Sequence, residues 1–307
     1  MITAPANGAS LASPFPFAGN TSGVPNVDHT RILLDGTSSI YYGGVVPYAN
    51  KWIFAPTGQH NLTLAAYGKN DKSIASTTIA INVSSETTPA VLSQLQSIAA
   101  WDWCTASLLG LPCASGLGQA TSAQVIGQSS PSDGGGTATL FTIGGTHPYS
   151  NALWWISLGG GTLLSHFTYD LDFYIDNAAA PEALEFDVNQ SFGGTRYTWG
   201  TECSYKNTRA WNVWNPQAGE WVTTSAPCPQ VTSNQWHHLE WQFERINNQV
   251  HYISVSVDNN TLPVDLYLNP QPNWNKEDID VAFQMDGDYQ QTPYRVWLDN
   301  VNLTASY

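Results

Sequence analysis

Two acidic residues two positions apart, Glu185 and Asp187, stand within the segment EALEFDVNQ (182–190). Successive side chains of an extended chain point to opposite faces, so both carboxyl groups project to one side and the apolar residues around them to the other. Carboxylates that share one face of a sheet repel each other. A pair in this arrangement suits acid–base catalysis, metal binding or hydrogen bonding to a sugar.

Other strand-like segments carry further carboxyl groups that can pair with Glu185. Glycosidases that invert configuration hold two carboxyl groups about 6.5–9.5 Å apart, and those that retain configuration hold them about 5–5.5 Å apart. Glu202, Asp172 and Asp286 each lie on the polar side of an alternating segment. Any of them completes such a pair if its strand adjoins that of Glu185, and the alternation alone leaves the strand order open.

Short alternating segments between clusters of Gly, Pro, Asn and Asp recur along the chain, and no long stretch keeps a 3.6-residue period. This pattern predicts an all-β protein. Residues 93–307 contain many such segments with long loops, which favours a large two-sheet sandwich or jelly roll. Residues 1–84 have the rhythm of a smaller β-sandwich. Residues 85–92 are predicted to link the two.

The first 84 residues resemble bacterial Ig-like modules. The resemblance is carried by ITAPANGASLASP, by ILLDG and by GQHNLTLAAYGKND followed by STTIAINV. It implies an Ig-like β-sandwich that serves as a spacer or accessory unit on a secreted bacterial protein.

Three segments of the longer part resemble the concanavalin A-like lectin/glucanase superfamily, in particular its laminarinase-like hydrolases and laminin-G-like domains. They are, in order, LEFDVNQ, QWHHLEWQFERINNQVHYISVSVDN and VWLDNVNLTA. The resemblance implies a concanavalin A-like jelly-roll sandwich whose groove binds or cleaves a glycan.

In the laminarinase-like hydrolases, the first of these strands carries three acids: a nucleophile, a helper and a general acid/base. The resemblance gives Glu185 the role of the nucleophile and Asp187 that of the helper. Where the third acid is expected, this chain has Asn189 and Gln190. A carboxamide does not serve as a general acid or base. The standard retaining site is therefore incomplete, and Gln190 is expected to hydrogen-bond a sugar hydroxyl instead.

All but one of the 13 tryptophans follow residue 92. Aromatic rings stack on the apolar faces of pyranose rings, so a groove lined with tryptophan can hold a polysaccharide. Of the adjacent Trp154 and Trp155, one is expected in the core and the other outside it. The residues expected to contact carbohydrate in an acidic, Trp-lined groove are Gln190, Trp199, Trp211, Trp214, Glu240 and Gln284.

The four cysteines fall into two local pairs, Cys104/Cys113 and Cys203/Cys228, without the CxxC spacing of zinc or redox sites. Three connectivities are open, and the local one closes short loops. Two structural disulfides are expected, with four buried thiols as the alternative. No cofactor is required. The resemblance to laminarinase-like enzymes places Asp299 at a structural calcium ion.

The net charge of −14 argues against nucleic acid and anionic membrane surfaces as partners. No apolar run approaches the roughly 20 residues of a membrane-spanning helix, so membrane insertion is not expected. The expected disulfides indicate a secreted or cell-surface protein, bacterial by the resemblance of its first part. No signal peptide follows Met1, so we expect a mature sequence.

Three functions remain open. The first is non-catalytic binding of a polysaccharide or other glycan in the acidic groove. The second is a glycan-cleaving enzyme, a glycoside hydrolase or polysaccharide lyase, that uses Glu185 and Asp187 with a carboxylate from another strand. The third is an adhesive or structural surface protein.

Overall fold

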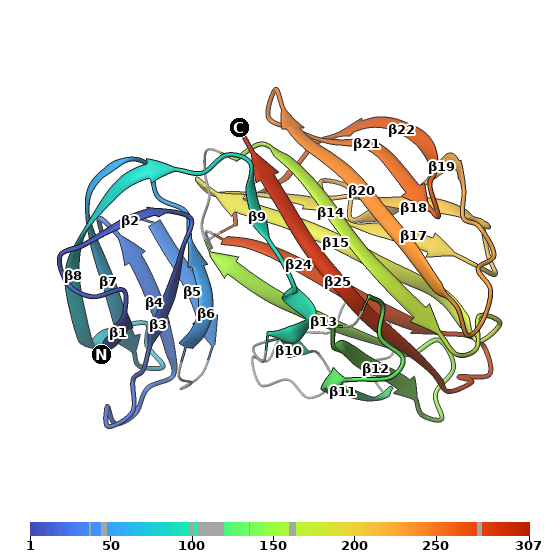
Figure 1. Ribbon diagram of the computed structural model, residues 1–307, viewed down its shortest axis with the longest axis horizontal. Coiled ribbons are helices and arrows are strands. Elements are labelled where there is room, and N and C mark those ends of the chain that lie inside the picture. Colours follow the sequence, from blue (N-terminus) through green and yellow to red (C-terminus); the bar gives the residue numbers. More distant parts are fainter. Residues whose placement is uncertain are drawn as a thin grey trace.

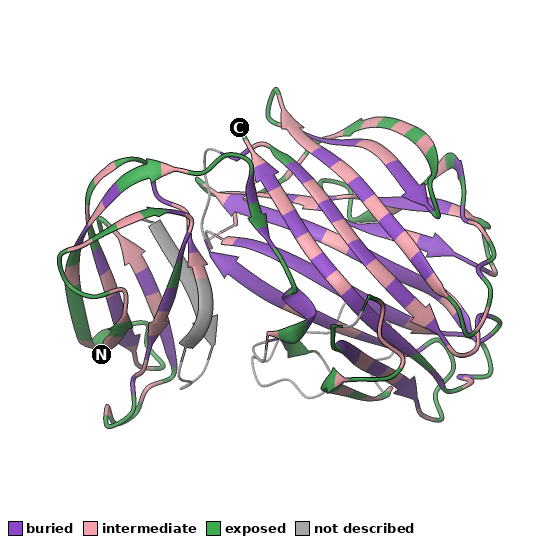
Figure 2. Ribbon diagram, in the orientation of Figure 1, coloured by how far each residue is buried: buried purple, intermediate pink, exposed green. Residues whose placement is uncertain are grey.

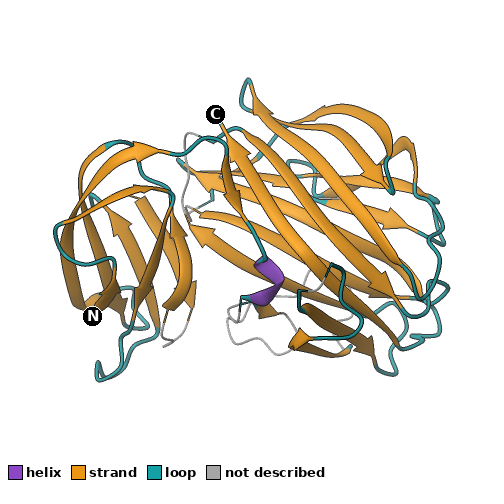
Figure 3. Ribbon diagram, viewed as in Figure 1, coloured by secondary structure: helices purple, strands orange, loops and turns teal. Residues whose placement is uncertain are grey.

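The computed structural model describes residues 1–36, 38–43, 48–98, 101–103, 120–134, 136–159, 164–274 and 278–307. β-Strands dominate these residues, and their one helix is the short 3-10 turn η1 (Leu95–Ser97), drawn in purple in Figure 3. The prediction of an all-β fold is confirmed. In the described parts of the chain, no helix is both long and apolar enough to cross a membrane.

The described residues up to Glu86 form two sheets, at the left of Figure 1. The three-stranded sheet runs in the order β1 (Ile2–Ala4), β3 (Phe15–Gly19), β6 (Tyr48–Ile53). The five-stranded sheet runs in the order β2 (Ala9–Ser13), β8 (Ser73–Glu86), β7 (Gly58–Tyr67), β4 (His29–Leu34), β5 (Ser38–Gly43). A buried apolar cluster that includes Phe17, Ile32 and Leu62 lies between them.

The rest of the described chain forms a nine-stranded and an eight-stranded sheet. The nine-stranded sheet runs in the order β10 (Asp102–Trp103), β13 (Asn151–Gly159), β24 (Asp278–Gly287), β15 (Pro181–Phe192), β17 (Thr201–Ser204), β18 (Ala210–Asn215), β19 (Glu220–Pro227), with β16 (Thr195–Trp199) beside β15 and β23 (Gln271–Pro272) beside β16. The eight-stranded sheet runs in the order β11 (Thr121–Gln128), β12 (Ala138–Gly144), β25 (Tyr294–Ser306), β14 (His166–Ile175), β20 (Trp236–Ile246), β21 (Gln249–Val257), β22 (Asn260–Leu268), with β9 (Ala90–Leu92) beside β25.

These two larger sheets pack face to face around a second apolar cluster. Aromatic rings meet across the space between them: Phe173 of β14 lies 5.8 Å from Phe186 of β15, and Phe167 lies 5.2 Å from Trp199. Buried and partly exposed residues alternate along β14, β20 and β25 in Figure 2, as in strands with one face in a core. Each sheet therefore has an inner apolar face and an outer face, and in Figure 1 the eight-stranded sheet lies in front.

The smaller pair of sheets touches the larger pair. Trp52 and Phe54 pack against the larger apolar cluster, and the Tyr307 hydroxyl near the end of β25 donates a hydrogen bond to Glu86. A Cβ atom added to Gly159 of β13 would lie 1.4 Å from the Trp52 carbonyl oxygen, so the two backbones are in direct contact. Of the segment predicted as a linker, the first residues belong to β8 and the last to β9, which leaves residues 87–89 between the strands.

Candidate functional site

The outer face of the nine-stranded sheet gathers the acidic residues that the sequence singled out. On β15, Leu184, Phe186 and Val188 are buried in the core, so Glu185 and Asp187 project from the other side as predicted. We call this side the carboxylate face and define it by the residues Glu185, Asp187, Asn189, Glu202, Asp280, Gln284 and Asp286.

One row of directly opposed residues crosses four strands of this face. Glu185 of β15 lies opposite Gln284 of β24 on one side and opposite Glu202 of β17 on the other. Glu202 in turn lies opposite Asn212 of β18. Directly opposed residues of antiparallel strands have Cβ atoms roughly 4.5–5.5 Å apart. The side chains of Glu185 and Glu202 are therefore neighbours on the same face of the sheet.

Carboxamide side chains hold the carboxyl groups in place. Gln284 donates from its amide nitrogen both to Glu185 and, at 3.0 Å, to Asp286 Oδ1. Asn212 donates to Glu202 at 2.9 Å. The backbone N–H of Thr201 donates to Asp187 at 2.9 Å. These donors fix each carboxyl group, and the nearby positive charge of Arg196 lowers the pKa of Asp187 against the effect of burial.

Burial and mutual repulsion favour the protonated form of these acids. Burial raises the pKa of Glu185 well above its usual value, and the nearby Asp286, Asp187 and Glu202 raise it further. Burial also raises the pKa of Asp187 to about 7 and that of Asp286 to about 8. Burial raises the pKa of Glu202 too, while the hydrogen bond from Asn212 opposes that shift. The hydrogen bond between Glu185 and Asp286 raises the pKa of the first and lowers that of the second, so the proton of this pair resides mainly on Glu185.

Asn189 stands at the third position of the laminarinase-like motif, and the neighbouring strand β24 places an acid, Asp280, directly opposite it. Asn189 shares the face of Glu185, and its amide donates to Asp280 of β24 at 2.7 Å. Arg196 donates to the Asn189 side-chain oxygen at 3.3 Å and stacks over the Trp274 ring at 4.5 Å. This end of the carboxylate face thus combines a carboxylate, a cation and an aromatic ring.

A second row places tryptophans on both sides of Asp187. Asp187 lies opposite Ala282, which lies opposite Trp155 of β13. On the other side, the backbone N–H of Trp214 on β18 donates to the backbone carbonyl of Gly200 at 2.9 Å, and Trp214 lies opposite Trp221 of β19. A Cβ atom at Gly200 would approach the Trp214 Cβ to 2.8 Å, so the absence of a side chain there lets Trp214 sit close to the sheet.

The tryptophans predicted to contact carbohydrate lie in two different environments, two of them buried and one partly exposed. Trp199 and Trp211, expected to contact carbohydrate, instead lie fully buried between the sheets. Trp214 is partly exposed and lies on the carboxylate face, where its ring packs against that of Trp221 at 5.2 Å. Of the adjacent pair, Trp154 is in the core and Trp155 is partly exposed, as predicted.

Gln190 was expected to bind a sugar hydroxyl, but its side chain lies buried between the two larger sheets. Its side chain is 1% exposed. It donates to the Leu164 carbonyl at 2.8 Å and accepts from Arg245 at 2.9 Å. The reason is strand alternation: Gln190 has the parity of Val188 and therefore points between the sheets.

Two other candidates lie on the wrong sheet to join Glu185. Glu240, expected at the carbohydrate site, and Asp172, considered as a partner for Glu185, both lie on the outer face of the eight-stranded sheet. There Glu240 accepts from Gln242 at 2.7 Å, and Asp172 contacts His238 at 2.9 Å. The two sheets of the sandwich separate these groups from the carboxylate face.

Asp299, the residue expected at a structural calcium ion, is fully buried on β25. Its two oxygens accept hydrogen bonds from the side chains of Gln96 and Ser132, both at 3.0 Å, and from the backbone N–H groups of Asp133 and Asn300. Protein donors therefore surround both oxygens. Across the described ranges, no group of three or more His, Cys, Asp or Glu side chains is arranged to hold a metal ion.

The disulfide between Cys203 and Cys228 is confirmed, with Cα atoms 5.3 Å apart. It ties the residue next to Glu202 on β17 to the segment after β19. Cys104 and Cys113, predicted to form the other disulfide, lie outside the described residues.

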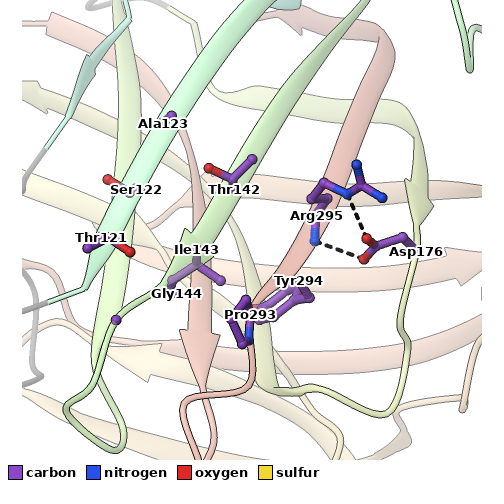
Figure 4. Close-up of a pocket in the computed structure, with 11 residues that line it drawn as sticks. Thr121, Ser122, Ala123, Thr142, Ile143, Gly144, Asp176, Pro293, Tyr294 and Arg295 are labelled. Carbon is purple, nitrogen blue, oxygen red and sulfur yellow. Dashed lines mark hydrogen bonds and ion pairs between the residues drawn. The ribbon is translucent and has the colours of Figure 1, made fainter.

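A separate hollow of about 510 Å³ lies by β11, β12 and the start of β25 (Figure 4). Its wall includes the hydroxyl groups of Thr121 and Thr142 and an ion pair in which Arg295 Nε donates to Asp176 at 2.7 Å. None of the residues of the carboxylate face lines it.

Asp280 on the carboxylate face, and Trp155 and Asn212 beside it, are among the residues that the predicted site lacked. Asp280 has the same parity on β24 as Gln284 and Asp286, so the alternation of DIDVAFQMDG contained the signal. For Trp155, the sequence predicted only that one member of the pair Trp154 and Trp155 lies outside the core. Asn212 enters the site through the pairing of β17 with β18, for which the sequence holds no local signal.

No protein-family model and no curated protein sequence matches the chain. Solved structures resemble it at low identity. One, from a study of carbohydrate-binding modules of the β-sandwich superfamily, has 12% identity and a TM-score of 0.34 and covers 98% of this chain and 95% of its own. Lectin I from Ulex europaeus, bound to a methyl glycoside of α-L-fucose, has 13% identity and a TM-score of 0.40 over 61% of this chain and 92% of its own. Alginate lyase Aly36B has 12% identity and a TM-score of 0.39 over 55% of this chain and 80% of its own. Likeness at this level does not extend to function.

Proposed function

We propose that this protein recognises a polysaccharide on its carboxylate face. The observation that carries the proposal is the row in which Trp155 on one side and Trp214 and Trp221 on the other flank Asp187. Partly exposed indole rings offer apolar surface to pyranose rings, and the carboxyl and amide groups between them offer hydrogen-bond partners for hydroxyls. Trp155 and Trp214 are four strand spacings apart, a span of roughly 19 Å. A site of this length suits a chain of several sugars.

A second candidate function, cleavage of the glycan, is favoured by the opposition of Glu185 and Glu202. Cleavage by two carboxyl groups needs one protonated acid and one ionised partner. Glu185, with its strongly raised pKa, fits the proton donor, although its resemblance to the laminarinase motif implies the nucleophile. Glu202, partly exposed and held by Asn212, fits the ionised partner. A lyase acting on uronates fits less well because the face repels a carboxylated chain.

The proposed setting is a secreted or cell-surface protein in which the sheets of residues 1–84 form an Ig-like accessory unit. The Cys203–Cys228 disulfide supports an oxidising location. The proposed boundaries follow the two apolar clusters, the first within residues 15–83 and the second within residues 92–305.

A panel of insoluble and soluble polysaccharides, assayed for protein retention and for release of reducing ends, tests both functions. Retention of the wild-type chain with loss of retention in a Trp155→Ala, Trp214→Ala double variant supports recognition. Release of sugar that disappears in Glu185→Gln supports cleavage. Glu240→Gln is the matched control, because Glu240 lies on the other sheet and its replacement should change neither readout. Absence of retention across the panel contradicts the proposed function.

A further inference from the structure

The hollow in Figure 4 lies on the outer face of the eight-stranded sheet. Its volume of about 510 Å³ falls within the range of roughly 300–1,000 Å³ that is typical of small-ligand clefts. Thr142 of β12 lies opposite Ala123 of β11 and Arg295 of β25, and all three line the hollow. Thr142 projects outward because its neighbours Phe141 and Ile143 are buried in the core. The hollow therefore opens on the side of the sandwich that faces away from the carboxylate face.

Gly144 keeps the floor of this hollow open. It lies opposite Thr121 on β11, and a Cβ atom added to it would come within 3.3 Å of Thr121 Oγ1 and 3.5 Å of the Pro293 ring. Its φ lies outside the left-handed region, so the backbone itself does not require glycine here. The missing side chain leaves space between Thr121 and Pro293 that a larger residue would fill.

An ion pair and two hydroxyl groups make the wall polar without a net charge. The Nε and backbone N–H groups of Arg295 donate to Asp176 at 2.7 Å and 2.9 Å, and the guanidinium lies 5.2 Å from the centre of the Trp297 ring. These contacts fix the guanidinium, although 57% of the Arg295 side chain is exposed. Together with the hydroxyls of Thr121 and Thr142, the pair offers hydrogen-bond donors and acceptors at set positions.

The next row of the same face is aromatic. Trp297 of β25 lies opposite Tyr174 of β14, which lies opposite Trp236 of β20. The Tyr174 ring is 5.4 Å from that of Trp297 and 5.6 Å from that of Trp236. Trp297 is only 6% exposed, whereas Tyr174 and Trp236 are partly exposed. Since β12 and β20 are three strand spacings apart, roughly 14 Å, one short oligosaccharide can reach both the hollow and these two rings.

We infer that this surface is a second glycan-binding site, which takes an uncharged segment of a polysaccharide. We call it the second glycan site and define it by Thr121, Thr142, Gly144, Tyr174, Asp176, Trp236 and Arg295. A pyranose presents an apolar face to aromatic rings and hydroxyls to the guanidinium, carboxylate and hydroxyl groups of the wall. The net charge of the chain, −14, opposes an anionic sugar, and the pairing of the charges in the wall gives a cationic one no preference.

Two sites on opposite sheets would make the chain bivalent. The second glycan site depends only on its own residues, whereas bridging of two polysaccharide chains also rests on the proposed recognition by the carboxylate face. A bivalent chain holds a polysaccharide surface more firmly than either site alone, and it links separate soluble chains.

NMR titration of the isotopically labelled full chain tests the site. The probes are the neutral hexasaccharides cellohexaose, laminarihexaose, mannohexaose and xylohexaose, with hexagalacturonate as the charged comparison. With at least one neutral probe, the indole N–H of Trp236 and the backbone N–H groups of Thr142 and Arg295 should shift together and follow one dissociation constant. Hexagalacturonate should shift them more weakly.

Variants at the two ends of the site locate the binding. Arg295→Ala and Trp236→Ala should each raise this dissociation constant at least about fivefold while leaving shifts on the carboxylate face unchanged. The matched control is Tyr267→Ala, which removes a 46% exposed ring from β22 at the far edge of the same sheet and should change neither set of shifts. Melting curves identify any variant that fails to fold.

Gly144→Val provides a second reading, because it fills the floor of the hollow while keeping every charge and ring. It should cause the same loss as Arg295→Ala. The Trp155→Ala, Trp214→Ala double variant should keep the shifts of the second glycan site but lose the turbidity that the wild-type chain produces with a soluble polysaccharide of the same linkage.

The outcomes separate this inference from the proposed function. Shifts confined to the carboxylate face overturn the second glycan site and leave the proposed function intact. Hexagalacturonate that binds as tightly as the neutral probes, or a loss in Tyr267→Ala equal to that in Trp236→Ala, also overturns the inference. Shifts at the second glycan site with none at the carboxylate face support it while the proposed function fails, and no shift at either face contradicts both.

Discussion

Glu185 and Glu202 occupy directly opposed positions on the antiparallel strands β15 and β17, with their side chains on the same outer face of the nine-stranded sheet. Each is held by a carboxamide, Glu185 by Gln284 and Glu202 by Asn212. The arrangement is costly if both acids are ionised, because like charges in a partly buried site repel strongly. It is tolerated because protons stay bound to some of the acids.

The first prediction concerns this mutual repulsion. Replacing Glu202 by Gln removes the charged neighbour that, after burial itself, raises the pKa of Asp286 most. We expect the pKa of Asp286 to fall from about 8 towards its usual range, and that of Glu185 to fall as well. Titration of the side-chain carboxyl carbons by NMR measures both. The control Glu240→Gln should leave them unchanged, and an unaltered titration in Glu202→Gln would mean that the charge of Glu202 does not contribute to these pKa values.

The second prediction is that the folded state loses stability as the pH rises. The pKa values of Asp187 and Asp286 rise on folding from 3.8 to about 7 and about 8, so between these limits the folded chain binds protons that the unfolded chain has released. Each such proton lowers the free energy of unfolding by about 1.4 kcal/mol per pH unit. The stabilisation is present below pH about 4 and is lost as the pH rises through about 8.

Denaturant unfolding at a series of pH values from about 5 to about 8.5 measures this slope. At about 1.4 kcal/mol per proton and pH unit, Asp187 accounts for about 3 kcal/mol between pH 5 and 7 and Asp286 for about 4 kcal/mol between pH 5 and 8, so we expect a combined loss of several kcal/mol. Asp286→Asn should flatten the curve, since its amide does not ionise. A free energy of unfolding that stays level or rises over this interval in the wild type contradicts the assignment of raised pKa values.

The third prediction concerns the Cys203–Cys228 disulfide, which joins residues 25 apart. Closing a loop of that size restricts the unfolded chain and is worth about 3 kcal/mol. A Cys203→Ala, Cys228→Ala double variant should lose about this much in free energy of unfolding. The adjacent Glu202 should become less firmly placed, so glycan affinity should fall together with stability. Reducing the disulfide in the wild type with a mild reductant should lower both the free energy of unfolding and the glycan affinity by the same amounts. A double variant as stable as the wild type would contradict the expected contribution of about 3 kcal/mol.

Local alternation was enough to predict part of the site. Glu185 and Asp187 face outward because Leu184, Phe186 and Val188 face the core, and that pattern is readable within one strand. The same rule places Gln190 inside, where the structure has it, yet the resemblance to a three-acid motif suggested a sugar contact. The strand's own parity was the better guide at that position.

The assembly of the site was out of reach of local reasoning. Gln284 donates to Glu185 across 99 residues of sequence, and that contact depends on β24 inserting between β13 and β15. Glu240 had the polarity and spacing of a groove residue but belongs to the other sheet. Polarity and period show which face of a strand points outward; only the strand order shows which outer faces coincide.

The last prediction concerns the contact between the smaller and larger pairs of sheets. Gly159 has a φ of +111°, and a Cβ atom there would lie 1.4 Å from the Trp52 carbonyl oxygen. Gly159→Ala should therefore both strain β13 and push Trp52 away, with a loss of more than about 1 kcal/mol in the free energy of unfolding. The matched control is Gly127→Ala, because Gly127 also has a positive φ, +79°, but no atom lies within 4 Å of its added Cβ.

Limited proteolysis distinguishes the loss of this contact from general destabilisation. If Trp52 and Phe54 hold the smaller sheets against the larger apolar cluster, Gly159→Ala should expose sites between residues 52 and 92 to cleavage, in addition to the loss of stability that the strain in β13 causes. Gly127→Ala should show the backbone cost without new cleavage there. Equal cleavage patterns in the two variants would mean that the close contact between Gly159 and Trp52 adds nothing measurable to the attachment of the smaller sheets, which the Tyr307–Glu86 hydrogen bond and the connecting segment would then maintain.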